Sequence, residues 1–334
     1  MMKIKILTIL MLTTALWLTS CTNGDDAAPE AASGLVTPPN GEPLRLSGIT
    51  RSGVIEAVAA DIKVLMMRDA KPGTYYEGSY VKTETGWQHL VSVNSENYHI
   101  YGYMPGDQVN ATPAMLSGSY ETGAVLTFDG LGAASPYDVC LITSVKKSAD
   151  DAFVPGNYAL DNSDNTNTVS LHLDHLMASV AFKVALGNSR NYAELRSIKL
   201  KTVSLKTKTL TKCVVTCRQG QALTESDIAF TLDTENRTAC PVFTGEGWLK
   251  APADTVKVTG YFVPSLYNDL ELVTEYDVYD KKGNKVRSDC KASNSLSLPS
   301  LNRGQQYTIK LTVEPTYLGQ LSDGDLNDPE IKIN

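Results

Sequence analysis

The sequence predicts an all-β protein made of antiparallel β-sandwiches. From about Ile49 onward, apolar residues recur at every second position, which is the period of a strand with one buried face. The apolar runs are short, Gly, Pro, Asn and Asp separate them, and no long stretch has helical periodicity. Many short strands without intervening helices favour antiparallel sheets that pack face to face.

Ten segments show this pattern most clearly. They span residues 62–66, 87–93, 98–104, 125–128, 137–145, 178–186, 198–205, 255–263, 271–279 and 307–313. In the sixth segment, Val180, Phe182 and Val184 share one face of the strand, whereas Ser179 and Lys183 share the other. We therefore expect one face of this strand to contact the core and the other to contact water.

The chain is long enough for about two domains, because it has 334 residues. The polar stretch 161–168 has almost no apolar side chain and has the composition of a linker. The sequence therefore predicts an N-terminal β-sandwich at residues 44–165 and a C-terminal β-sandwich at residues 166–334. Each part is large enough to bury a core of its own.

The charge balance and the motif content exclude several functions. The chain has 37 acidic and 30 basic residues, so its net charge of −7 does not favour contacts with nucleic-acid phosphates. No HExxH, GxSxG, GxxxxGKS/T or GxGxxG motif occurs, and no two cysteines form a CxxC pair. We therefore expect no enzymatic activity, no nucleic-acid partner, no cofactor and no metal.

Two histidines and two acid-rich loops are the candidates for a metal site in this sequence. His172 and His175 are three residues apart in a predicted strand, so they point to opposite faces and do not share one ion. The loops at 161–165 and 323–327 alternate oxygen ligands as a calcium loop does. Neither loop has the Gly at position six or the Glu at position twelve of such a loop, so we interpret both as solvated turns.

Residues 1–20 have the pattern of an export signal. Two lysines precede the apolar run 6–18, which is too short to span a bilayer. The run ends in Leu-Thr-Ser-Cys, which resembles a bacterial lipobox, so Cys21 is the predicted acylated first residue of the exported protein. The alternative is an ordinary secretory signal followed by an unmodified cysteine. Several acyl chains on one residue would hold the protein firmly on a membrane.

Residues 21–43 read as a flexible tether, because they are rich in Ala, Pro, Gly and Asn and lack periodicity. Asp25 and Asp26 follow the lipobox closely and resemble the short acidic signal that directs lipoproteins of Bacteroidia to the outer cell surface. The alternative is a solvated acidic patch, and both interpretations can hold together.

Five cysteines remain if Cys21 is acylated. They are Cys140, Cys213, Cys217, Cys240 and Cys290, an odd number, so at least one is unpaired within the monomer. Cys213 and Cys217 are four residues apart in a strand-like run, which is ~13 Å and beyond the reach of a disulfide. We expect mostly buried free thiols, with a Cys240–Cys290 or a Cys213–Cys240 bridge left open.

Asp254-Thr255-Val256 resembles the Asp-Thr-apolar pattern of O-glycosylation on exported proteins of Bacteroides. Thr255 is therefore a candidate glycosylation site. The same residues also read as the start of the strand 255–263, where the hydroxyl group would simply face solvent.

The order of several segments carries a family resemblance. The lipobox is followed by the segments 44–51 (LRLSGITR), 98–105 (YHIYGYMP) and 173–182 (LDHLMASVAF) and by a tail at 307–329. Together these resemble the fimbrillin family of Bacteroidia. The resemblance implies two transthyretin-like β-sandwich domains in tandem and a structural and adhesive role as a stalk, tip or anchor subunit of a cell-surface pilus.

The resemblance also implies how such a subunit assembles and where it lies. Stalk-type members lose their first strand when a trypsin-like protease cuts after an Arg, and another subunit then donates a strand to the vacated groove. Arg51 is the first candidate for this cut and Arg45 the second, and the donor would be the tail 329–334. The alternative is a loop arginine that is never cut. The implied partners are other pilus subunits, the outer membrane and a ligand on a host or bacterial surface.

A second function class is a surface lipoprotein that binds a glycan or another ligand for nutrient uptake. Glycan sites usually display exposed aromatic residues, and Tyr75, Tyr76 and Tyr80 form the one aromatic cluster that the sequence suggests is solvent-facing. A binding assay on glycans separates this function from that of a pilus subunit.

Overall fold

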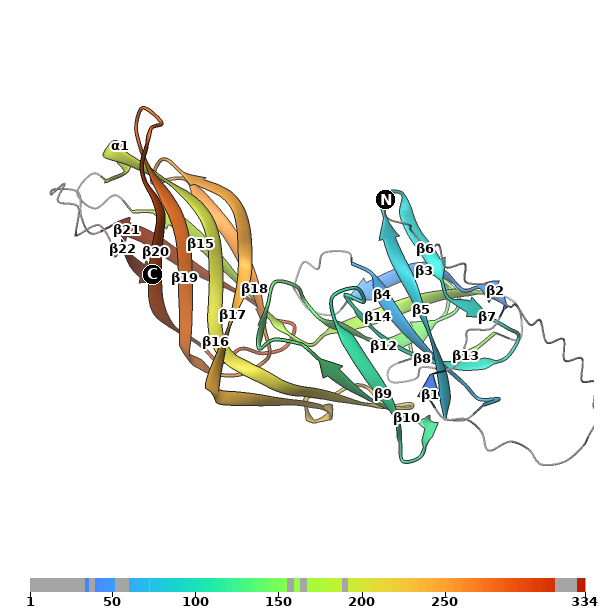
Figure 1. The fold of residues 1–334 in the computed structure, drawn as a ribbon. Helices are drawn as coiled ribbons and strands as arrows, with labels where there is room; N and C mark the ends of the chain where they lie inside the picture. The colour runs from blue at the N-terminus through green and yellow to red at the C-terminus, as the bar shows by residue number, and fades with distance from the viewer. Residues whose placement is uncertain are drawn as a thin grey trace, which may run out of the picture.

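A computed structural model describes residues 34–35, 40–51, 60–71, 73–154, 159–162, 167–187, 192–315 and 329–333. The described chain is built almost entirely of strands, with one short helix, α1 (Tyr192–Leu195), and one 3-10 turn (Glu225–Asp227) (Figure 1). The predicted all-β class is confirmed. The transthyretin-like topology of each part stays a prediction.

The first half of the chain forms a nine-stranded sheet. Its strand order is β1-β5-β4-β8-β12-β14-β3, with β6 paired to β5 and β13 paired to β8. The strands are β1 (Gly34–Leu35), β3 (Arg45–Arg51), β4 (Ile62–Arg68), β5 (Thr74–Thr83), β6 (Gly86–Leu90), β8 (Asn97–Met104), β12 (Cys140–Lys146), β13 (Ala159–Asp161) and β14 (Thr168–His175). A separate small ladder joins β2 (Glu42–Pro43) to β7 (Ser92–Val93).

Two further sheets form the other part of the molecule. The six-stranded sheet has the order β20-β19-β16-β10-β9, with β17 paired to β16, and the five-stranded sheet has the order β11-β18-β15-β21-β22. The strands of the six-stranded sheet are β9 (Asn110–Leu116), β10 (Ser119–Asp129), β16 (Arg196–Arg218), β17 (Ile228–Leu249), β19 (Tyr267–Asp280) and β20 (Lys285–Leu298). Those of the five-stranded sheet are β11 (Ala134–Ser135), β15 (Ala178–Leu186), β18 (Thr255–Phe262), β21 (Gln306–Pro315) and β22 (Pro329–Ile333).

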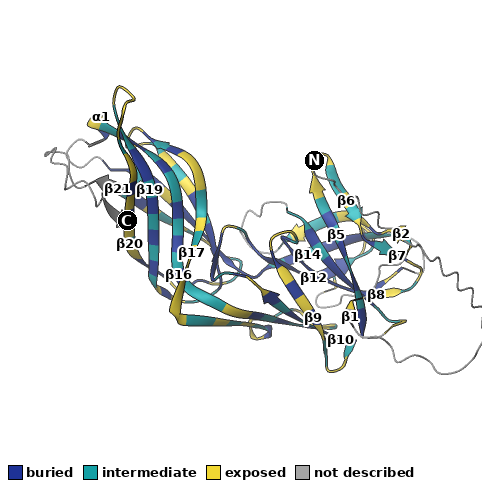
Figure 2. Ribbon diagram, viewed as in Figure 1, coloured by how far each residue is buried: buried dark blue, intermediate teal, exposed yellow. Residues whose placement is uncertain are grey.

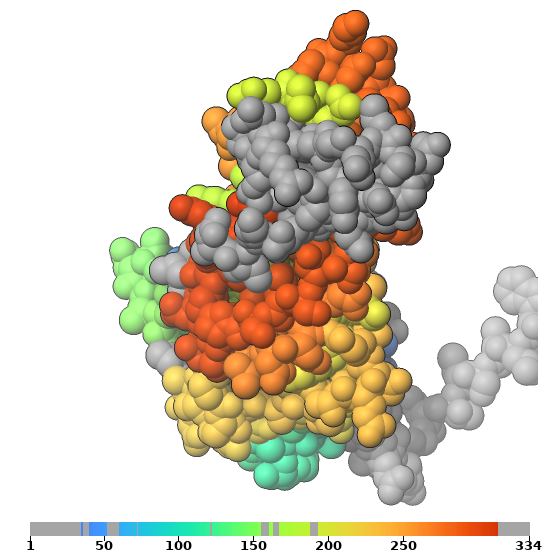
Figure 3. Space-filling view, turned by 90° about the vertical axis from the view of Figure 1, so that its left-hand side faces the viewer, coloured from blue at the N-terminus to red at the C-terminus, as the bar shows by residue number. Residues whose placement is uncertain are grey.

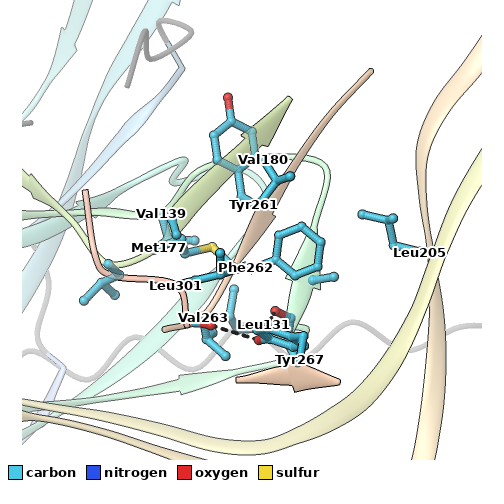
Figure 4. Close-up of a cluster of buried hydrophobic side chains, with 14 of the residues drawn as sticks. Leu131, Val139, Met177, Val180, Leu205, Tyr261, Phe262, Val263, Tyr267 and Leu301 are labelled. Carbon is cyan, nitrogen blue, oxygen red and sulfur yellow. Dashed lines mark hydrogen bonds between the residues drawn. The ribbon is translucent and has the colours of Figure 1, made fainter. Parts of the chain in front are cut away.

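The five- and six-stranded sheets pack face to face around one core. Phe182 of β15, Leu205 of β16 and Leu272 of β19 are fully buried in the same cluster of apolar side chains. Tyr267 lies in this core, and its hydroxyl group donates to the backbone oxygens of Val263 (2.9 Å) and Ala133 (3.2 Å) (Figure 4). A buried phenol needs such a partner, and here it ties β19 to the residue before β11 and to the residue after β18.

The outer face of β15 is less exposed than the sequence predicts. Lys183 faces solvent as expected, but Ser179 is 1% exposed. Its partner across the ladder is Tyr261 of β18, which is itself buried and lies close to Asp138. The loop before β12 therefore covers this end of the five-stranded sheet, and only the far end of the outer face is wet.

The nine-stranded sheet encloses a second core. Val64 and Met66 of β4, Ile100 of β8 and Leu171 of β14 are all buried in this cluster. Figure 2 shows β8 and β14 as mostly buried strands in this part of the molecule, whereas buried and intermediate residues alternate along β5. The sheet curls so that β3, the last strand of its path, approaches β6 at the other side of the core.

A hairpin formed by β9 and β10 connects the two parts. It precedes the predicted linker in sequence, yet β10 pairs with β16 from Gly123↔Arg218 to Phe128↔Cys213. It also covers the outer face of β8, because the Tyr103 and Phe128 rings lie 5.3 Å apart. Figure 3 shows the hairpin, in teal, emerging beneath the gold residues of the second part. The middle of β8 is therefore buried on both faces, which explains its continuous apolar run.

Sheet membership changes between β14 and β15, at Leu176 and Met177. The predicted boundary of 44–165 and 166–334 lies slightly earlier, and the β9–β10 hairpin crosses it in the opposite direction. Independent folding of the two parts stays a prediction.

The expected solvent-facing tyrosine cluster is wrong. Tyr76 and Tyr80 are each 1% exposed, and only Tyr75 is partly accessible. Tyr76 and Tyr80 are four residues apart on β5, so both point into the core of the nine-stranded sheet. The aromatic surface on which the glycan-binding alternative was based is absent at these positions.

Candidate functional site

β3 lies at the edge of the nine-stranded sheet and is attached to it through a single neighbour. It runs parallel to β14, with partners from Thr168↔Arg45 to Leu173↔Arg51 and one register shift at Val169/Ser170. A strand at the end of a sheet can be exchanged without breaking any other ladder. Residues 45–51 can therefore be removed without breaking any other ladder of this sheet, as can the shorter terminal strands β1, β6 and β13.

The apolar side chains of this segment hold it against the core. Leu44 is fully buried, and Leu46 and Ile49 pack on the cluster inside the nine-stranded sheet. On the outer side, the Ser47 hydroxyl group lies 2.8 Å from the Ser170 hydroxyl group. Removing the strand would expose an apolar groove along β14, together with one unpaired backbone edge.

The two candidate cleavage residues stand at the two ends of β3. Arg45 is exposed, and its backbone N–H donates to the Asn167 oxygen at 2.8 Å. Arg51 is half-buried, and its guanidinium group lies 3.0 Å from the Met104 sulfur. A cut after Arg51 would detach the whole strand, whereas a cut after Arg45 would leave all but its first residue in place.

The C-terminal strand β22 forms the edge of a different sheet. It pairs antiparallel with β21 from Leu311↔Ile333 to Pro315↔Pro329. β3 and β22 lie at opposite ends of the molecule (Figure 1). Exchangeable edges at opposite ends are the arrangement from which head-to-tail polymers form.

A buried polar cluster lies where the two parts of the molecule meet. Asp138 precedes β12, Cys140 begins it, and His175 ends β14 directly opposite Cys140. The Cys140 sulfur lies 3.3 Å from Nδ1 of His175 and 3.4 Å from Oδ2 of Asp138, and Nδ1 and Oδ2 also touch. Burial, followed by the charge of Asp138, raises the pKa of the Cys140 thiol well above its usual value. In the part of the chain that the structure describes, this is the one group of three metal-ligating side chains.

The cluster does not have the geometry of a catalytic triad. Both the sulfur and the carboxylate contact the same imidazole nitrogen, Nδ1. A nucleophilic cysteine needs one ring nitrogen to take its proton and the other to be oriented by the acid. Its raised pKa also keeps Cys140 protonated, so this arrangement does not activate a thiol for nucleophilic attack.

The sequence does not predict this cluster, because Asp138, Cys140 and His175 match no ligand motif. Asp138 and Cys140 are two residues apart, which places them on one face of a strand, and this is the one local signal. Their approach to His175 depends on the β12–β14 register, which the sequence alone does not specify. His172 points away from the cluster, as its spacing from His175 predicts, and its ring contacts Thr50.

The remaining predicted sites have different outcomes. Cys21 and both candidate calcium loops fall wholly or partly outside the described residues. Thr255 is exposed at the start of β18, so it is accessible, and its glycosylation stays a prediction.

All five described cysteines are free thiols, which confirms the expectation for Cys213 and Cys217 and removes the two bridges left open. No helix in the described ranges is long and apolar enough to cross a membrane.

Comparison with known proteins supports the family resemblance. The chain is similar to a putative cell adhesion protein from Bacteroides fragilis (12% identity, TM-score 0.42, covering 89% of this chain and 95% of that one). It is also similar to a fimbrial protein from Bacteroides vulgatus (13%, 0.34, 86% and 98%) and to the fimbrial anchor protein Mfa2 from Porphyromonas gingivalis (13%, 0.28, 86% and 95%). Among curated proteins, no sequence matches significantly. The model of the fimbrillin-like family matches residues 61–327, and the chain therefore belongs to that family.

Proposed function

We propose that the protein is a structural subunit of a cell-surface pilus that joins its neighbours by strand exchange and is exported as a lipoprotein. Membership of the fimbrillin-like family supports a pilus-related role at the cell surface. The observation that carries the proposal is the position of β3 as an edge strand whose removal would open an apolar groove. The proposed role is structural and adhesive, not enzymatic.

The groove left by β3 would suit a donor strand from another subunit. Backbone hydrogen bonds along β14 would give affinity, and pockets vacated by Leu46 and Ile49 would set the register. The tail 329–334 carries apolar residues at Ile331 and Ile333, with Lys332 between them. Its proposed partner is the groove of the next subunit, which binds it after cleavage behind Arg51.

Trypsin treatment of the purified protein tests this mechanism. We expect cleavage after Arg51 to produce ladders of oligomers that resist SDS under mild conditions, because an inserted strand is held by a full ladder of hydrogen bonds. The ladders should disappear in Arg51→Ala and in a deletion of residues 329–334, whereas the matched control Arg45→Ala should keep them. A cleaved product that stays monomeric at high concentration contradicts strand exchange.

A synthetic peptide of residues 44–51 tests the groove itself. Added in excess during cleavage, it should rebind to the groove and stop the ladder. A control peptide with Leu46 and Ile49 replaced by Ser should have no effect, because it lacks the two side chains that pack on the core. Equal inhibition by both peptides contradicts the proposed groove.

The lipid anchor is proposed at Cys21, which would tie the subunit to the outer membrane. Cys21→Ala should leave a precursor that is not labelled with fatty acid and does not reach the outer membrane. Replacing Asp25 and Asp26 with Ala should keep the label but reduce surface exposure, measured by protease accessibility on intact cells. A Cys21→Ala protein that remains membrane-bound and surface-accessible contradicts the anchor.

A further inference from the structure

We propose that Asp138, Cys140 and His175 bind a divalent transition metal of the zinc class at the junction of the two parts of the molecule. The three side chains come from the loop before β12, from β12 itself and from the end of β14. Sulfur, imidazole nitrogen and carboxylate oxygen are the three donor types that zinc prefers in proteins.

The spacing of the donor atoms fits a tetrahedral ion. Metal bonds of about 2.0–2.3 Å separate neighbouring tetrahedral ligands by about 3.3–3.8 Å. The Cys140 sulfur lies 3.3 Å from Nδ1 of His175 and 3.4 Å from Oδ2 of Asp138. All three donor atoms lie within 4.8 Å of one another. A small increase in the distance between Oδ2 of Asp138 and Nδ1 of His175 would therefore place all three atoms at the separations of tetrahedral ligands.

Hydrogen bonds alone do not satisfy this triangle. It has three contacts but at most two protons, one on the Cys140 sulfur and one on Nδ1 of His175. One of the three contacts therefore has no proton of its own. A cation at the centre interacts favourably with all three atoms at once, and its binding would release the thiol proton to solvent.

A second observation also points to a missing ligand. Oδ1 of Asp138 is buried and has no hydrogen-bond partner, although the side chain is only 4% exposed. An ionised carboxylate with an unpartnered oxygen is costly in a core unless a cation lies beside it. Asp138 also lines a cavity of about 280 Å³ together with Met104 and Tyr261, so water can reach the fourth coordination position from that side.

The position of the cluster indicates that a bound ion would stabilise the junction between the nine-stranded and the five-stranded sheets. His175 is followed within three residues by β15, and Tyr261 of β18 lies beside Asp138 and Cys140. Figure 4 shows Val139, which lies between Asp138 and Cys140, close to Met177, which lies between His175 and β15. An ion held here would connect β12 to β14 and fix the junction to which the five-stranded sheet is attached.

The test is titration of the purified, metal-free protein with cobalt(II), which reports its ligands by absorption. We expect one cobalt per chain, a sulfur-to-cobalt charge-transfer band in the near ultraviolet, displacement by zinc and a rise in melting temperature with either ion. A folded wild-type protein that gives no band and no rise in melting temperature with excess cobalt or zinc overturns the proposal.

Variants assign the ligands. Cys140→Ser should abolish the charge-transfer band, and His175→Gln should weaken metal binding at least tenfold. The matched controls are Cys213→Ser, which removes a buried thiol elsewhere, and His172→Gln, which removes the neighbouring histidine of the opposite face. Circular dichroism confirms folding of each variant. A band that survives in folded Cys140→Ser, or that is lost in Cys213→Ser, overturns the assignment.

Discussion

Raising the pH above 10 is expected to unfold the protein cooperatively. Burial raises the pKa of the phenols of Tyr76, Tyr80, Tyr101 and Tyr267 far above the ordinary value of 10.0, and it raises that of Tyr120 to about 12. These residues belong to both cores, so the effect concerns the whole molecule.

The direction follows from proton binding. Above pH 10, each tyrosine loses its proton in the unfolded chain but keeps it in the folded protein. The unfolded state then binds fewer protons, so the free energy of unfolding falls as the pH rises. Each of the most deeply buried tyrosines contributes about 1.4 kcal/mol per pH unit to this fall, against a total stability of about 5–15 kcal/mol. Below pH 10 the same groups leave the stability unchanged.

Absorption at 295 nm and circular dichroism, recorded together against pH, measure this transition. The part of the tyrosinate signal that comes from the buried tyrosines should appear with the loss of strand signal and not before it. Tyr80→Phe is the matched variant, because the Tyr80 hydroxyl group is buried without a hydrogen-bond partner. We expect this variant to unfold at higher pH and to be no less stable at pH 7. Ionisation of all tyrosines near pH 10 in a folded protein contradicts the expectation.

Phe182→Ala is expected to lower the free energy of unfolding by about 3–5 kcal/mol. Phe182 is fully buried between the five- and six-stranded sheets, and its neighbour across the ladder is Val258 of β18. The substitution removes most of a large side chain from a packed core and leaves a cavity that strands on both sides cannot easily close.

Urea denaturation at pH 7 measures the loss, and Lys183→Ala provides the control. Lys183 is the next residue of the same strand, and its side chain faces solvent. Its replacement should change the free energy of unfolding by no more than about 0.5 kcal/mol. Similar losses in the two variants would mean that β15 does not have the core face described here.

The sequence predicted the strands that have one clear apolar face. The segment 178–186 has the same bounds as β15, and the nine other expected segments all overlap strands. A strand segment in which both faces are mostly polar gives no such signal. β16 continues far beyond the expected 198–205. Residues 206–212 (KTKTLTK) contain Leu210 as their one apolar side chain, before Cys213 and Val215 become buried in the core. Such a segment has no period-two apolar signal.

The sites were less predictable than the strands. Arg45 and Arg51 could be selected from the sequence because a resemblance marked their segment. Asp138, Cys140 and His175 could not, since strand pairing brings together residues that are remote in sequence. Tyr76 and Tyr80 are a different case, because their even spacing indicates one shared face, but spacing alone does not tell whether that face is buried or exposed.

The β9–β10 hairpin has a consequence for the order in which the chain folds. The ribosome completes residue 129 long before it makes β16, the strand with which β10 pairs. Until residues 213–218 arrive, one backbone edge of β10 has no partner and is open to pairing with other chains. The sheet that contains this hairpin therefore cannot be completed from the nascent N-terminal half. A protein of this topology reaches its native state only after most of the polypeptide has been synthesised, which suits a chain that crosses a membrane before it folds.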